Sequence, residues 1–97
     1  MPRSPFVWET HVRREVLDAE LEKLQELPYS LWQDAMKAPM TRAVNGRDGR
    51  AYRLLVQADW SQRGSEDIRV LVTLQTPRLH RRLMRASFVI TPTNRIS

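Results

Sequence analysis

The feature that most constrains the fold is a two-residue alternation of apolar and polar side chains in residues 52–60 and again in residues 68–75. Because successive side chains of a strand point to opposite faces, this alternation predicts two strands with one face in the core. The predicted inward-facing residues are Tyr52, Leu54, Val56, Ala58, Trp60, Ile68, Val70, Val72 and Leu74. The predicted outward-facing residues are Arg53, Leu55, Gln57, Asp59, Arg69, Leu71, Thr73 and Gln75.

Glycine-containing turns join these strands into a meander. Asn45-Gly46 and Asp48-Gly49 follow a strand that starts near residue 40, and residues 62–67 make the second reversal. Glycine and asparagine accept a positive φ at low cost, as tight reversals require. Residues 76–86 suit either a short basic helix or a fourth strand at the sheet edge. We favour the strand because it continues the meander.

Two helices are expected before the sheet. Thr10 is the predicted N-cap of a helix that runs to about Leu27, with Val16 or Leu17, Leu21, Leu24 and Leu27 on one side. Ser30 is the predicted cap of a second helix that runs to about Lys37 and is ended by Pro39. The expected fold is one α+β domain with two N-terminal helices packed on one face of a three- to four-stranded antiparallel sheet. Within residues 1–97 it comprises a loose arm (1–5) with an anchor at 6–8, a helical part (10–37), the sheet (40–90) and a frayed tail (93–97).

Composition narrows the functional classes. The chain has 97 residues, no cysteine and a formal net charge of +5, so disulfides are excluded. Residues 1–38 carry a net charge of −2 and residues 39–97 a net charge of +7, which suits a polyanion or an acidic partner for the sheet half. Neither a membrane span nor a signal peptide is predicted, so we expect a cytoplasmic protein.

No constellation of residues points to catalysis, a cofactor or a metal. The two histidines, His11 and His80, have no second histidine at i+3 or i+4, and no G-x-S-x-G motif presents a serine nucleophile. We therefore expect a protein without enzymatic activity. Glu20, Glu22 and Glu26 are expected to form a solvated helix face. Asp59-Trp60 could frame a small pocket at a strand end, but Trp60 is expected to lie in the core with Asp59 pointing outward.

The remaining candidate site is the outward face of the sheet. Leu55 and Leu71 with Arg53 and Arg69 form an apolar centre with a cationic rim, which is typical of a contact with a partner protein or with a second copy across a two-fold axis. Arginines on a sheet face also suit nucleic acid phosphates, although no aromatic side chain is expected there for base stacking. A plain solvated basic surface is the alternative to both. The nucleic acid hypothesis uses Arg42, Arg47, Arg50, Arg53, Arg69, Arg81, Arg82 and Arg85, with Arg78 in support.

Several segments together resemble an uncharacterised family of small bacterial proteins. The shared pattern is T-R-x-V-x-G-x-D-G at residues 41–49, then Tyr52, Val56-Gln57, Asp59-Trp60, Ile68-Arg69-Val70 and Phe88-Val89-Ile90 with Pro92, preceded by Leu27-Pro28-Tyr29. The likeness covers about residues 24–92. It implies a compact α+β fold and supplies no activity, ligand or catalytic residue. Around residues 78–85 the chain departs from the family pattern by its arginines, so any role of these is particular to this protein.

Overall fold

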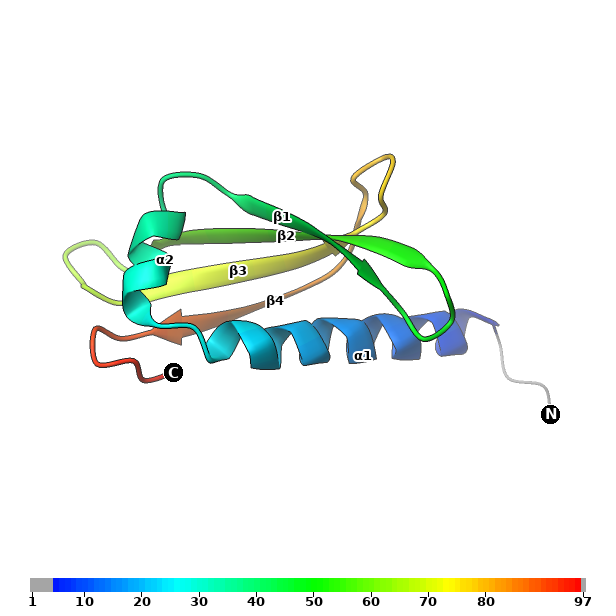
Figure 1. Ribbon diagram of the computed structural model, residues 1–97, viewed down its shortest axis with the longest axis horizontal. Helices are drawn as coiled ribbons and strands as arrows, with labels where there is room; N and C mark the ends of the chain where they lie inside the picture. The colour runs from blue at the N-terminus through cyan, green and yellow to red at the C-terminus, as the bar shows by residue number, and fades with distance from the viewer. Residues whose placement is uncertain (1–4, 97) are drawn as a thin grey trace.

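The computed structural model describes residues 5–96, which form two helices and one four-stranded antiparallel sheet (Figure 1). The elements are α1 (Pro5–Gln25), α2 (Tyr29–Ala35), β1 (Met40–Asn45), β2 (Ala51–Trp60), β3 (Ile68–Gln75) and β4 (Arg82–Ile90). The strands lie in the order β1-β2-β3-β4, so each pairs with its neighbour in sequence. The α+β class and the meander are therefore confirmed. A strand is also confirmed for the second half of residues 76–86, whereas residues 76–81 form the loop that leads to it.

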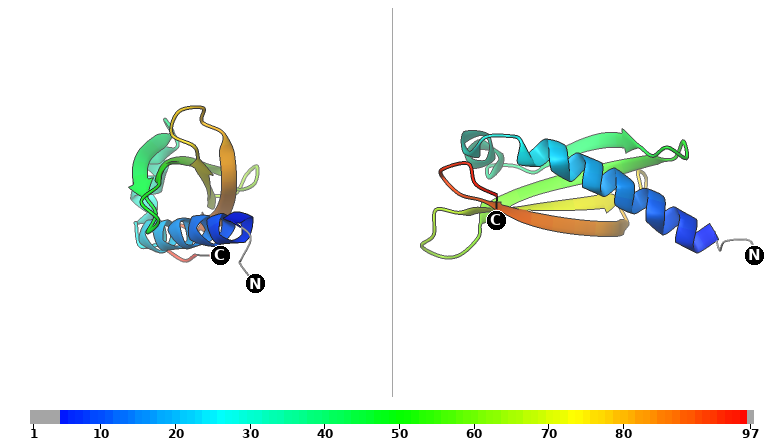
Figure 2. Two further views of the ribbon diagram at one scale, coloured as in Figure 1. Left: turned by 90° about the vertical axis from the view of Figure 1, so that its right-hand side faces the viewer. Right: turned by 90° about the horizontal axis from the view of Figure 1, so that it is seen from below.

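The alternation in β2 and β3 builds the core as predicted. Leu54, Ile68, Val70, Val72 and Leu74 are all fully buried. They share one apolar cluster with Leu17 and Leu24 of α1 and with Trp32 of α2, whose ring meets that of Phe88 edge-on with the centroids 5.8 Å apart. Figure 2 shows α1 lying across one side of the curved sheet, while the β3–β4 loop projects on the opposite side.

Helix α1 begins earlier than the sequence suggested. It starts at Pro5, so Thr10 lies inside the helix and its predicted role as N-cap is wrong. Proline fits a first helical turn because the N–H that it lacks has no partner within the helix there. Arg14 and Asp18 form an i, i+4 ion pair on this helix, with 3.5 Å between Nε and Oδ1. The arm was expected to extend to residue 5, but Pro5 is the first residue of α1; residues 1–4 and the side chains of residues 6–8 lie outside what the structure describes.

Helix α2 begins at Tyr29 after Pro28, so the predicted cap Ser30 is wrong. Tyr29 joins three parts of the chain. Its backbone N–H donates to Oδ1 of Asn94 over 2.8 Å, and its hydroxyl donates to the backbone oxygen of Glu66. Ile96 forms a β-bridge with Ile90. The C-terminal segment was expected to fray from residue 93, and these bonds hold residues 94 and 96 against the fold instead.

Two ends of the sheet depart from the simple alternation. Trp60 was expected in the core but is 48% exposed. The reason is the length of β1, whose last pair with β2 is Met40 with Val56, so Trp60 has no neighbouring strand on that side. At the other end of the sheet, Thr73 and Gln75 are buried although their position was expected to be solvated.

Candidate functional site

The candidate site is the sheet face turned away from the core, called here the outer face. The β2–β3 register sets Arg53 opposite Gln75, Leu55 opposite Thr73, Gln57 opposite Leu71 and Asp59 opposite Arg69. Across β3, Gln75 lies opposite Arg82 and Thr73 opposite Arg85. Since residues paired in register share a face, the strands bring together Arg53, Leu55, Arg69, Leu71, Arg82 and Arg85, as the alternation predicted.

Two leucines form the centre of this face. Leu71 lies opposite Gln57, two residues along from Leu55, so Leu55 and Leu71 are diagonal neighbours on adjacent strands. Both are half-buried. The arginines at positions 53 and 69 lie one register step beyond the leucines at either end. The arrangement is a small apolar centre between cationic groups.

Arg42 does not belong to this face, contrary to the prediction. It pairs in register with the buried Leu54, which places it on the core side of β1. There its Nη2 lies 2.8 Å from Oε2 of Glu20 on α1. The alternation in β1 also indicates that Arg42 lies on the core side, because residues 42 and 44 share a face and Val44 is buried.

Glu20 was expected on a solvated helix face and is instead buried, with 6% of its surface exposed. It falls between Leu17 and Leu24 on the helical period, so the side of α1 that enters the core carries it inward. Arg42 and Lys23 supply its positive partners, the latter with 3.4 Å between Nζ and Oε1. Glu22 and Glu26 are exposed as expected.

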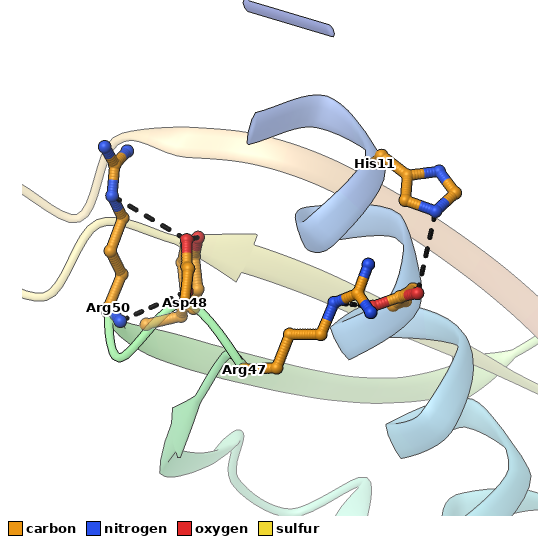
Figure 3. A network of polar contacts seen from close by, with 6 residues as sticks. His11, Arg47, Asp48 and Arg50 are labelled. Atoms are coloured by element: carbon orange, nitrogen blue, oxygen red, sulfur yellow. Dashed lines mark hydrogen bonds and ion pairs between the residues drawn. The ribbon is translucent and has the colours of Figure 1, made fainter. Parts of the chain in front are cut away.

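The β1–β2 loop places two further arginines beside carboxylates, although each side chain stays 55% exposed (Figure 3). Nε of Arg47 lies 3.0 Å from Oε2 of Glu15 on α1, whose other oxygen lies 3.6 Å from Nε2 of His11. Nε of Arg50 lies 3.7 Å from Oδ2 of Asp48. Of the arginines proposed to contact nucleic acid, those at positions 42, 47 and 50 thus already have intramolecular partners.

The other arginines proposed to contact nucleic acid have no carboxylate partner among the described side chains. There, no carboxylate oxygen lies within 4.0 Å of a side-chain nitrogen of Arg53, Arg69, Arg78, Arg81, Arg82 or Arg85. Asp59 lies across from Arg69, but its Oδ1 accepts the backbone N–H of Trp60 over 2.8 Å. The outer face and the β3–β4 loop therefore carry positive charge that the described fold does not neutralise.

Shallow hollows flank the leucine centre. At one end, a hollow of about 300 Å³ is lined by Gln57, Ala58, Asp59, Trp60, Arg69 and Leu71. This is the pocket that Asp59-Trp60 could frame, and Trp60 is among its lining residues. At the other end, two hollows of about 320 and 710 Å³ lie beside Pro77 of the β3–β4 loop.

In the described part of the chain, no three His, Asp or Glu side chains come together in a way that could hold a metal ion. Neither described helix combines the length and the apolar composition needed to cross a bilayer. His80, in the β3–β4 loop, adopts a left-handed backbone with φ of 50°.

No family model, curated protein or solved structure matches this chain. Sequence reasoning missed two parts of the candidate site: the exposed Trp60 and the hollow beside Pro77. The sequence did contain a signal for the hollow beside Pro77. Leu79 follows Thr76-Pro77-Arg78 in a stretch of arginines, where no apolar neighbours were predicted to bury it.

Proposed function

We propose that this protein is a non-enzymatic binding module whose outer face contacts an acidic surface of a partner protein. The observation that supports this most is the set of arginines without carboxylate partners around Leu55 and Leu71. Apolar centres with a polar rim are the usual anatomy of protein interfaces, and arginine is enriched in them. The charges of the partner would complete the ion pairs that the described chain leaves open.

An acidic partner fits this face better than a second copy of the chain. A two-fold contact would place the outer face against itself, so that Arg53, Arg69 and Arg85 would meet arginines. Among the outward residues of β2 and β3, Asp59 alone is acidic and could offset these positive charges. One of its oxygens already accepts a backbone N–H. Juxtaposed like charges oppose association, whereas acidic side chains would favour it.

The proposal takes both helices to pack on one face of the sheet, which leaves the other open for the partner. The cluster shared by Leu17, Leu24 and Trp32 with the inward residues of β2 and β3 supports this. A cytoplasmic location and membership of the small bacterial family also belong to the proposal, and each rests on sequence pattern alone.

Nucleic acid binding is the second candidate, and one observation favours it. Trp60 is 48% exposed and lines the same hollow as Arg69. An exposed indole next to an unpaired guanidinium could stack on a base and contact the neighbouring phosphate. The contact set would then be Arg53, Arg69, Arg81, Arg82 and Arg85 with Trp60, without the arginines at positions 42, 47 and 50. Affinity for single-stranded DNA or RNA that falls steeply with added salt would identify this function.

Affinity capture from a nuclease-treated lysate of the source organism separates the candidates. We expect the wild-type protein to retain an acidic protein that the Leu71→Glu variant loses, because the new carboxylate repels the partner and disrupts the apolar centre. Light scattering at two concentrations distinguishes self-association, which would appear as a mass that rises with concentration and falls in the variant. Retention of the same proteins by both forms would contradict the proposal.

A further inference from the structure

The two hollows beside the β3–β4 loop adjoin, since Ala51 and Pro77 line both, and we treat them together as one groove. The smaller hollow also borders Thr41, Ala43 and Arg53, so the groove opens onto the outer face. The larger, of about 710 Å³, lies within the range of about 300–1,000 Å³ that is typical of ligand pockets. We call this feature the loop groove.

The loop groove combines an apolar floor with cationic edges. Ala51, Pro77 and Leu79 supply apolar surface, and Leu79 is 84% exposed. Arg53, Arg78 and Arg81 line the same hollows and have no carboxylate within 4.0 Å among the described side chains. Large apolar side chains left in water next to unpaired charges are typical of binding surfaces.

The loop that forms one wall is held in shape by its own hydrogen bonds. The backbone N–H of Thr76 donates to the Arg81 oxygen over 2.9 Å, and the backbone N–H of Arg81 donates to Oγ1 of Thr76 over 3.0 Å. These two bonds close the loop at its base. A preorganised wall lowers the ordering cost when a ligand binds.

We propose that the loop groove is the anchor point for a short acidic segment of the partner protein. An apolar side chain of that segment enters the hollow over Ala51 and Pro77, and carboxylates on either side of it pair with Arg78 and Arg81. Charge complementarity and continuity with the outer face through Arg53 identify this occupant. The inference rests on the proposed function and adds where the partner is held and what sequence chemistry is recognised.

The test uses a fluorescein-labelled octapeptide with two leucines flanked by acidic residues, titrated by fluorescence anisotropy and by residue-resolved NMR. Two companion peptides replace either the leucines by serine or the acidic residues by their amides. Ala51→Trp fills the groove, and its control Ala51→Ser keeps it open. Arg78→Glu changes the charge at the groove, and Arg63→Glu makes the same change in net charge in the β2–β3 loop.

We expect Ala51→Trp and Arg78→Glu to weaken binding of the octapeptide by about tenfold or more, with both controls within about twofold of wild type. Both companion peptides should bind more weakly than the octapeptide. Equal weakening by Arg63→Glu and Arg78→Glu would overturn the inference, because net charge alone would then explain binding. So would the absence of any binding by the octapeptide.

NMR distinguishes failure of the loop-groove inference from failure of the proposed function. If the octapeptide shifts the resonances of Leu55 and Leu71 while Ala51→Trp has no effect, the loop groove is not the anchor and the outer face still binds. If lysate capture also shows no partner that depends on Leu71, the proposed function fails as well. Shifts centred on Ala51 and residues 76–81 support the inference.

Discussion

Glu20 of α1 and Arg42 of β1 form an ion pair that joins the first helix to the first strand, with 2.8 Å between Oε2 and Nη2. The carboxylate side chain is 7% exposed and the guanidinium side chain 52% exposed. The pair is therefore unequal. Loss of Arg42 leaves a buried carboxylate whose remaining ion-pair partner among the described residues is Lys23, whereas loss of Glu20 leaves an arginine that can turn into water.

We predict that Arg42→Met lowers the free energy of unfolding by about 1–3 kcal/mol, because a buried carboxylate is left short of partners. The double variant Glu20→Leu, Arg42→Met should regain most of this loss, since the buried carboxylate itself is then replaced by an apolar side chain. Urea denaturation of the single and double variants measures both values. A double variant that is less stable than Arg42→Met alone would contradict this account.

Two glycines of the β1–β2 loop should respond differently to alanine. A Cβ at Gly46 would lie 2.6 Å from Oδ1 of Asp48 in the same loop and 3.1 Å from Cγ1 of Val12, so Gly46→Ala displaces the Asp48 side chain and crowds the loop against α1. We expect a loss of about 1–3 kcal/mol. Gly49 has a φ of 78° and open space around it, so Gly49→Ala should cost about 1 kcal/mol and Gly49→Asn less. Equal effects of alanine at both sites in urea denaturation would refute the docking of the loop on the helix.

Stability at alkaline pH should depend on Tyr29. Burial, followed by the charges of Glu66 and Asp67, raises the pKa of this tyrosine above its ordinary value of 10.0. A raised folded-state pKa contributes stability below pH about 10 that is lost as the pH rises through the folded-state pKa. Tyr29→Phe should be less stable than wild type at neutral pH and should lose less on going from pH about 9 to 11.

Thermal melts across this pH range provide the check. Some alkaline loss should remain in Tyr29→Phe, because the pKa of Tyr52 is also raised, by burial and by Asp48. An alkaline loss as large in the variant as in the wild-type protein would show that the hydroxyl bond from Tyr29 to Glu66 does not hold α2 to the β2–β3 loop.

Gln75 should tolerate an apolar replacement. Its side chain is buried, and its Oε1 finds no hydrogen-bond donor among the described residues. An unsatisfied buried acceptor carries a desolvation penalty, so Gln75→Met should leave stability unchanged or raise it by about 1 kcal/mol. Calorimetric melting temperatures of the two forms give the comparison. A marked loss in Gln75→Met would show that the amide makes contacts with Arg53 or Arg82 that stabilise the fold.

The strands and their order were predictable because the alternation in residues 52–60 and 68–75 has a single consistent interpretation. Gly49 and Gly64 at the reversals have φ values of 78° and 82°, as such turns require. The face carrying Leu55 and Leu71 followed directly from this pattern. Local sequence rules succeed here because the strands pair with their neighbours in the chain.

The wrong predictions concern side chains whose burial depends on neighbours that are distant in the sequence. Trp60 is exposed because the pairing of β1 with β2 extends only to Val56. The alternation in β2 does not determine the length of the neighbouring strand β1. Glu20 lies on the core side of α1, between Leu17 and Leu24, but its ion pair with Arg42 is a long-range contact that no local pattern reveals. In β4, a register shift opposite Leu74 and Gln75 brings both Leu83 and Met84 against the core, which breaks the two-residue period.

Site-specific photo-crosslinking in cells of the source organism examines whether the outer face contacts an acidic partner protein. A benzophenone amino acid is placed at Leu71 on the outer face or at Asp18 on the exposed side of α1. We expect an adduct with an acidic protein from position 71, resistant to nuclease, absent from position 18, and lost when Arg53 and Arg69 are changed to glutamate. The same adducts from both positions, or an adduct at position 71 that survives the charge reversal, would contradict it.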